Sequence, residues 1–207
     1  MTYILHNRPG SGGFVIEAVL DLAGADWRLE TVDSPVSTPL PESFRAVNPV
    51  KQIPVLDLPD GTRMTESAAM LIHLAAAFPE SGLAPPPGTS AHAQFLRWTV
   101  FLSNAVYEAV LRRTYPERYT ADPAGADAVR QAALATLDQG FAVLEDAIVG
   151  GGFLLGESMT ATDIYLAMLY YWHDRLRGGL PGCTAITRAV RAHPKVAPSW
   201  RRNFERG

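Results

Sequence analysis

The chain has 207 residues, 47% of them hydrophobic and 19% charged, so it can bury a substantial core in one large or two small domains. Its net charge of −3 argues against a general nucleic-acid-binding surface. The single cysteine, Cys183, and the lack of a secretory signal pattern or a membrane-length apolar run predict a cytoplasmic protein without nucleic-acid or membrane partners.

Residues 1–78 alternate between strand-like and helix-like patterns. In chain order we expect a strand at Tyr3–Leu5, a helix at Phe14–Ala23, a strand at Trp27–Val32, a helical turn at Glu42–Val47, strands at Pro54–Leu58 and Thr62–Met64, and a helix at Glu66–Phe78. The order β-α-β-α-β-β-α is the one that a thioredoxin-like α/β domain needs.

Residues 79–89 are rich in Pro, Gly and Ser and read as a linker. Residues 90–207 then read as an all-helical domain. Its expected helices are Ala91–Arg113, Asp127–Val149, Ala161–Arg175 and Thr184–Ala192, with a last turn near Ser199–Phe204.

A proline stands at the entrance to a short apolar run, at Pro54. Proline cannot donate to a sheet ladder, so Pro54 lies at a strand start, an edge or a turn. Bonds before proline are the only ones that take the cis form cheaply, and a cis Ile53-Pro54 bond would turn the N–H and C=O of Ile53 outward. An extended peptide could then pair with Ile53 as an added strand.

Glu66 and Ser67 open an apolar helix soon after this proline. Free N–H groups and the dipole at a helix start favour a carboxylate. A peptide-pairing site and an anion site together suit a small acidic peptide such as glutathione. The alternative interpretation is a strand with a proline turn, followed by an ordinary helix.

This pairing of motifs, followed by a helical domain, resembles the cytosolic glutathione transferases, and the resemblance covers essentially the whole chain. It implies a thioredoxin-like domain followed by an all-α domain, glutathione as co-substrate, no metal, and a homodimer. The implied activity is that of a transferase for alkyl or aryl groups, a detoxification chemistry in which glutathione attacks a small hydrophobic electrophile.

The resemblance also implies roles for the residues of the two motifs. Ile53, before Pro54, would pair its backbone with the cysteinyl unit of glutathione. The side chains of Lys51 and Gln52 would reach the glycine carboxylate, although either could be an ordinary solvated side chain. Ser67 would hold the γ-glutamyl carboxylate, with Glu66 near the ammonium group of the same unit.

Ser11 is the only hydroxyl in the turn before the first helix, and it stands where serine-type family members carry theirs. A hydroxyl that donates to sulfur, together with a helix N-terminus, lowers the pKa of a thiol from about 8.5. Ser11 could equally be a turn or cap residue, and the backbone N–H groups of Gly12 and Gly13 are alternative donors. Beta-type bacterial enzymes carry a cysteine at the position of Gly12, so its absence argues against a mixed disulfide with glutathione.

Two tyrosines, Tyr107 and Tyr115, are candidates for the electrophile pocket. Tyr107 falls where beta-type enzymes place an active-site histidine, and its phenol could donate a hydrogen bond to a developing charge or line the pocket. Aromatic residues on helices are usually core residues, which is the alternative for both.

A capping motif occurs at Thr160 and Asp163, where a hydroxyl at N-cap is followed by an acid at N3. It predicts a buried helix with a role in folding. The function expected for the chain is thus a glutathione transferase. Two alternatives stay open: a glutathione-dependent disulfide or peroxide reductase, and a non-catalytic glutathione-binding or assembly module on the same fold.

Overall fold

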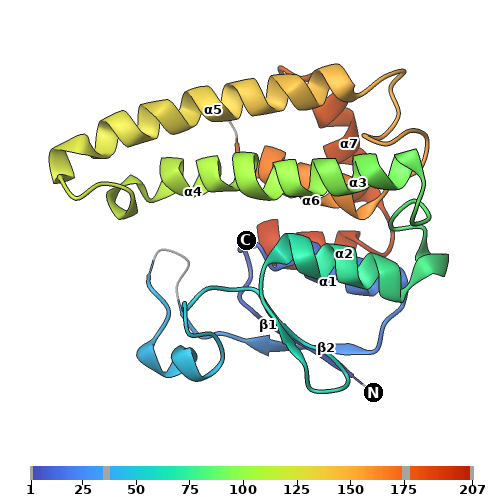
Figure 1. Ribbon diagram of the computed structural model, residues 1–207, viewed down its shortest axis with the longest axis horizontal. Coiled ribbons are helices and arrows are strands. Elements are labelled where there is room, and N and C mark those ends of the chain that lie inside the picture. Colours follow the sequence, from blue (N-terminus) through green and yellow to red (C-terminus); the bar gives the residue numbers. More distant parts are fainter. Residues whose placement is uncertain (1, 35–37, 174–177, 206–207) are drawn as a thin grey trace. The chain divides into compact units, whose positions relative to one another are not determined.

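The computed structural model describes residues 2–34, 38–173 and 178–205, and the chain forms two compact units. The N-terminal unit comprises Met1–Ala84 together with Arg191–Gly207, and the helical unit comprises Pro85–Val190. The first is a layer of strands covered by helices, and the second is built from helices (Figure 1).

A four-stranded mixed sheet organises the N-terminal unit, with the strand order β2-β1-β3-β4. Strand β1 pairs in parallel with β2 and antiparallel with β3, which in turn pairs antiparallel with β4. The strands are β1 (Tyr3–Asn7), β2 (Trp27–Thr31), β3 (Val55–Asp57) and β4 (Arg63–Met64). This topology confirms the thioredoxin-like architecture predicted from the element order.

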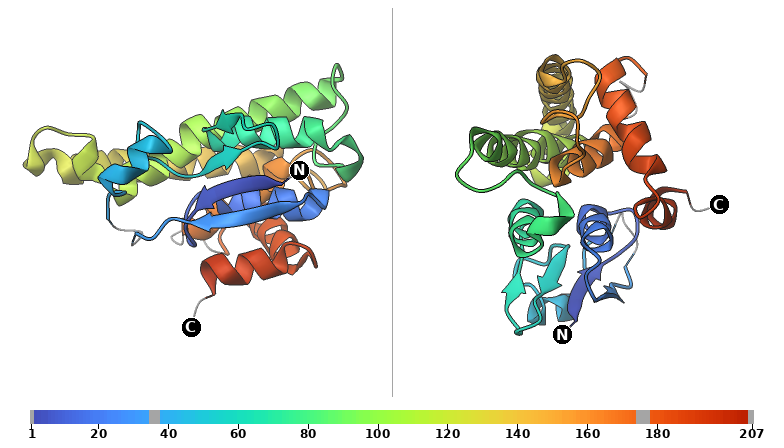
Figure 2. Two further views of the ribbon diagram at one scale, coloured as in Figure 1. Left: turned by 90° about the horizontal axis from the view of Figure 1, so that it is seen from below. Right: turned by 90° about the vertical axis from the view of Figure 1, so that its right-hand side faces the viewer.

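Helices α1 (Phe14–Ala23) and α2 (Ser67–Ala77) pack against each other and lie on the same face of the sheet (Figure 2). Every side chain of α1 from Phe14 to Leu20 is buried. The helix ends at Gly24, whose φ of 66° is a left-handed conformation that glycine adopts without steric cost. A smaller apolar cluster forms where Phe44 of the 3-10 turn η1 (Glu42–Ala46) packs near Val55.

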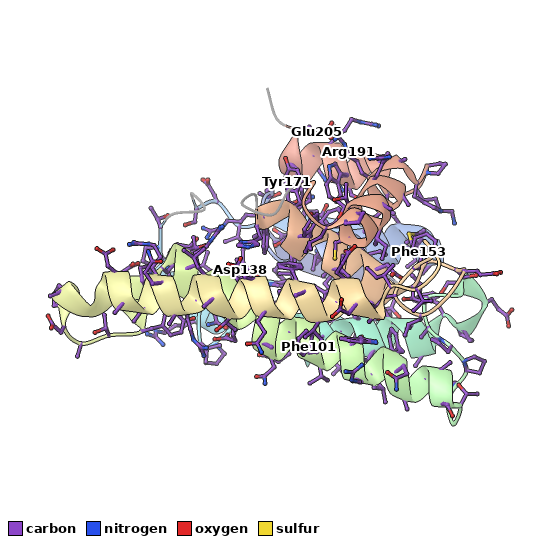
Figure 3. All side chains as sticks on the ribbon, turned by 90° about the horizontal axis from the view of Figure 1, so that it is seen from above. Phe101, Asp138, Phe153, Tyr171, Arg191 and Glu205 are labelled. Atoms are coloured by element: carbon purple, nitrogen blue, oxygen red, sulfur yellow. The ribbon has the colours of Figure 1, made fainter. Side chains whose placement is uncertain are left out.

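The end of the chain packs with the N-terminal unit. Helix α8 (Ala197–Phe204) contacts α1 through aromatic rings, with centroids 5.4 Å apart for Phe14 and Trp200 and 4.9 Å apart for Phe14 and Phe204. An ion pair of 2.7 Å joins Arg191 to Glu205, and Figure 3 labels both side chains. By its contacts, the segment from Arg191 onward groups with the N-terminal unit, because its aromatic side chains complete the apolar surface of α1. The domain boundaries expected from the sequence stay a prediction.

The elements of the helical unit are α3 (Ser90–Phe101), the π-helical segment η3 (Leu102–Tyr107), α4 (Glu108–Thr114), α5 (Ala126–Ala147), α6 (Ala161–Trp172) and most of α7 (Pro181–Ala192). Helix α6 is the most buried helix of the unit. None of the helices in the described ranges combines the length and apolar character of a membrane span.

One helix was predicted from Ala91 to Arg113, and the structure differs in its middle, where η3 separates α3 from α4. Helix α5 approaches η3 closely at Gly140, where an added Cβ would lie 3.3 Å from Cγ2 of Val106. The missing side chain of Gly140 therefore lets α5 pack tightly against the π turn.

The predicted capping box of α6 is confirmed, and residues 161–170 are all buried. The helix was expected to continue to Arg175. Its described part ends at Trp172, with His173 as C-cap, and residues 174–177 lie outside the described ranges.

Candidate functional site

Three segments that the sequence singled out converge at one end of the sheet. His6 of β1 pairs with Val55 of β3, and Leu56 pairs with Met64 of β4. In antiparallel pairs this register places the end of β1, the start of β3 and the end of β4 next to one another. The loop after β1, the Ile53-Pro54 segment and the start of α2 therefore leave the sheet at the same end.

The Ile53-Pro54 bond is cis, as predicted. The pairing of β3 with β1 begins only at Val55, and neither the N–H nor the carbonyl of Ile53 is hydrogen-bonded to another described residue. Asn48, which is buried, folds the preceding loop: its Nδ2 donates to the carbonyl of Gln52 at 2.8 Å, and its Oδ1 accepts from the N–H of Val50 at 3.1 Å. This role of Asn48 has no signal in the sequence.

Helix α2 begins with an unusual backbone conformation. Glu66, its N-cap, has φ 65° and ψ 102°, a positive φ that non-glycine residues adopt rarely and at a cost of about 1–3 kcal/mol. Its side chain is exposed, whereas Ser67, the first helical residue, is buried. The first N–H groups of a helix lack intrahelical acceptors, so this end of α2 is suited to an anion.

The cation near the Ile53 segment has a carboxylate partner. Nζ of Lys51 lies 2.9 Å from Oε2 of Glu42, and Arg45 also pairs with this carboxylate. The hydrogen bond from Lys51, followed by that from Arg45, lowers the pKa of Glu42. Gln52 is exposed beside Lys51.

The hydroxyl of Ser11 lies within hydrogen-bond distance of two oxygens, at 2.6 Å from Oδ1 of Asn7 and 2.7 Å from the carbonyl of Arg8. A hydroxyl has one proton, so it donates to one of these at a time. Gly12 and Gly13 are buried. Gly13 lies so close to Asn7 that an added Cβ would be 2.1 Å from Cγ of Asn7, so a side chain at this position would force the Asn7 amide to move.

A buried carboxylate, Glu17 of α1, stands behind this loop and was missed in the sequence analysis. It accepts hydrogen bonds from Asn7, Arg202 and Asn203. One signal was available: a charged residue in the middle of the apolar run from Phe14 to Leu20 predicts a buried, paired charge. The identity of its partners has no sequence signal, since Arg202 and Asn203 lie at the other end of the chain.

The two candidate pocket tyrosines belong to the helical unit. Tyr107, the last residue of η3, contacts the rings of Tyr165 at a centroid distance of 6.2 Å and Trp172 at 5.7 Å. Burial raises the pKa of Tyr107, so its phenol stays protonated and can donate. Tyr115 caps the end of α4, and its ring carries the guanidinium of Arg118 at 3.9 Å.

Two family models match the chain: Glutathione S-transferase, N-terminal domain, over residues 15–77, and Glutathione S-transferase, C-terminal domain, over residues 127–202. The chain is 27% identical over 199 residues to the GST-like protein YncG of Escherichia coli K12, covering 94% of this chain and 95% of that protein.

Two solved structures are also similar. A glutathione transferase from Methylococcus capsulatus strain Bath shares 30% identity and a TM-score of 0.81, over 96% of this chain and 97% of that one. A glutathione transferase homologue from Sulfitobacter, solved with bound glutathione, shares the fold with a TM-score of 0.86 at 23% identity, over 95% of this chain and 96% of that one.

Proposed function

Because this chain belongs to the bacterial cytosolic glutathione S-transferase family, we propose that it binds glutathione and directs its thiolate at a small electrophile. The observation that carries the proposal is the convergence, at one end of the sheet, of the Ile53 peptide groups and the start of α2. A peptide with a carboxylate near the paired residue would use both features.

In the proposed complex the backbone of Ile53 pairs with the cysteinyl unit in the manner of an added strand. The N–H and hydroxyl of Ser67 bind the γ-glutamyl carboxylate, and the exposed carboxylate of Glu66 attracts the neighbouring ammonium group. Pro54, which is buried at the entrance to β3, holds this edge in place.

The glycine carboxylate of glutathione is assigned to Lys51 and Gln52. Since Lys51 is paired with Glu42 in the free protein, the ligand competes with Glu42 for this cation. Glu42 is largely exposed, at 70% of its side-chain surface, and such pairs are weak. The exchange of one carboxylate for another therefore opposes binding only slightly.

Ser11 is proposed as the residue that stabilises the thiolate. Lowering the pKa of the thiol by two units requires about 2.7 kcal/mol, which a hydroxyl donor and the start of α1 can supply together. In the reaction the sulfur lone pair forms a bond to an electrophilic carbon, and the leaving group departs with the electrons of the bond that breaks. Tyr107 and Tyr115 are proposed to contact the electrophile, with the protonated phenol of Tyr107 as a hydrogen-bond donor.

Calorimetry with glutathione and S-methylglutathione tests the binding proposal. Both ligands should bind about equally, because the peptide and anion ends carry the affinity, and Ser67→Ala should weaken both alike. Failure of both ligands to bind wild-type protein at millimolar concentration would refute the proposal and favour an assembly module.

Thiolate absorbance of the bound complex against pH tests the role of Ser11. Ser11→Ala should raise the pKa of bound glutathione and lower turnover, with affinity for S-methylglutathione nearly unchanged. Overlapping titration curves for wild type and Ser11→Ala would show that Ser11 does not stabilise the thiolate. The N–H groups of Gly12 and Gly13 would then be the candidate donors. A panel of aryl halides, epoxides and enones, set against disulfides and hydroperoxides, separates a transferase from a reductase.

A further inference from the structure

A buried polar network connects the last helix of the chain to the loop that contains Ser11. Asn203 of α8 is its bridge. Oδ1 of Asn203 accepts the N–H of Gly10 at 3.0 Å, and its Nδ2 donates to Oε2 of Glu17 at 3.1 Å and to the carbonyl of Ser199 at 2.9 Å. Asn203 is buried, with 7% of its surface exposed, so both ends of its amide are satisfied away from solvent.

Glu17 is the centre of the network. It is completely buried, and its Oε2 also accepts from Nη2 of Arg202 at 2.7 Å. Its other oxygen, Oε1, accepts from Nδ2 of Asn7 at 3.1 Å. Oδ1 of Asn7 lies 2.6 Å from the hydroxyl of Ser11, which donates either to it or to the carbonyl of Arg8 at 2.7 Å.

Chemistry fixes the orientation of both amides in this network. A carboxylate only accepts hydrogen bonds, so Asn7 and Asn203 must each turn their NH₂ group toward Glu17. Their Oδ1 atoms consequently face the loop, where that of Asn7 is one of the two possible acceptors of the Ser11 hydroxyl and that of Asn203 accepts the N–H of Gly10. Hydrogen bonds to an ionised acceptor are stronger than neutral ones, so Glu17 holds both amides firmly.

We propose that Asn203 is a positioning residue for the thiolate-stabilising loop, and that through Asn203 and Glu17 the C-terminal helix sets where the side chain of Ser11 lies. This inference rests on the function proposed above for Ser11. Gly10 has a φ of 80°, and its N–H bond to Asn203 holds the loop just before Ser11. In the free protein Oδ1 of Asn7 or the carbonyl of Arg8 accepts the hydroxyl proton of Ser11. A hydroxyl donates one hydrogen bond at a time, so this proton must turn to the thiolate when glutathione binds. The hydrogen bond from Gly10 to Asn203 does not depend on that proton and still holds the loop.

The assignment predicts a separation between turnover and binding. Asn203 lies outside the residues assigned to glutathione, so its removal leaves the peptide and anion contacts in place. A loop displaced by about 1 Å lowers a rate by up to about 100-fold. Asn203→Ala should therefore lower kcat about 10- to 100-fold and raise the pKa of bound glutathione. The KM for glutathione and the affinity for S-methylglutathione should stay within about twofold.

Amide hydrogen exchange measured by NMR tests the anchoring step without any ligand. In wild-type protein the N–H of Gly10 should be protected, and Asn203→Ala should accelerate its exchange about tenfold or more. The N–H of Ala25, which donates to the carbonyl of Leu20, reports whether the unit remains folded. Arg201→Ala, an exposed neighbour on the same helix, is the matched control and should leave exchange and kinetics unchanged.

The outcomes separate this inference from the proposed function. Unchanged protection of the Gly10 N–H in Asn203→Ala would overturn the positioning role alone. So would faster exchange in Asn203→Ala with an unchanged thiol pKa, provided that Ser11→Ala does raise the pKa of bound glutathione. Absence of glutathione binding to wild-type protein would overturn both proposals. If Asn203→Ala does not fold, Asn203→Ser, whose shorter hydroxyl cannot reach Gly10, provides the same measurements.

Discussion

The two units each contain a completely buried carboxylate, Asp163 of α6 and Glu17 of α1, and they satisfy it in different ways. Asp163 accepts from the N–H of Leu154 at 2.8 Å and from the N–H and hydroxyl of Thr160 at 2.7 and 2.8 Å. Burial raises the pKa of Asp163, and these hydrogen bonds oppose the rise. All of its partners lie within nine residues along the chain.

Glu17 is satisfied by distant partners instead. Asn7 lies ten residues before it, whereas Arg202 and Asn203 lie 185 and 186 residues after it. Only the folded N-terminal unit, with α8 packed on α1, brings these donors together. A local cap stabilises one helix, whereas the Glu17 network joins the two ends of the chain and reaches the candidate catalytic loop.

The largest expected effect is that of Glu17→Ala. Removing the carboxylate leaves the amide of Asn7 without this acceptor and takes one acceptor from the amide of Asn203, which keeps the carbonyl of Ser199. Each buried donor left unsatisfied costs about 1–3 kcal/mol, and the new cavity adds to the loss, whereas Arg202, with 37% of its side chain exposed, can be solvated. Urea denaturation followed by circular dichroism should show this loss of unfolding free energy. Glu17→Gln keeps one acceptor oxygen and should be destabilised less. A cost below about 1 kcal/mol for Glu17→Ala would mean that the network contributes little.

Asp163→Ala is expected to cause the next largest loss of unfolding free energy. It leaves the N–H groups of Leu154 and Thr160 buried without an acceptor, at a cost of about 2–3 kcal/mol in unfolding free energy. Asp163→Asn retains an acceptor oxygen, so its unfolding free energy should lie between those of Asp163→Ala and the wild type. Should Asp163→Ala destabilise the chain more than Glu17→Ala, the distant network would be the weaker of the two.

Gly13→Ala tests the packing of Asn7 against the loop. The new methyl group would overlap the Asn7 amide, and such overpacking costs about 1–3 kcal/mol. A double-mutant cycle with Asn7→Ala, measured by the same denaturation, should show that the double variant loses less than the sum of the two single variants. If the stability losses of the two single variants were additive, the cost of Gly13→Ala would not come from overlap with Asn7.

Thr160→Ala should have the smallest effect, about 1 kcal/mol, because it removes one cap hydroxyl. The change should appear in the denaturation midpoint, with turnover unaltered. An unchanged midpoint together with altered turnover would contradict the structural role of this cap. Thr162→Ser is a matched substitution on the same helix, and it retains a hydroxyl near Thr99, the partner of Thr162 at 3.2 Å. It serves as the control that shows how far a conservative change alone shifts the denaturation midpoint.

Much of the architecture was predictable because its signals are local. Gly24 ends α1 where expected, and the cap at Thr160 and Asp163 marked the start of α6. The motifs at Ile53-Pro54 and Glu66-Ser67 were also recognisable, since proline and helix-start preferences act over a few residues. The interruption of the predicted helix by the π segment before Tyr107 was not, because it coincides with the close approach of α5 at Gly140.

The sequence by itself determined the two-part plan, the strand and helix order and the segments of the candidate site, since periodicity, caps and turn residues depend on near neighbours. Only the tertiary structure decided that residues 191–205 pack with the N-terminal unit, and that Asn7, Glu17 and Asn203 meet behind Ser11. Contacts between residues so far apart form only when the whole unit folds, because apolar packing of α8 on α1 must offset the entropy of closing the chain.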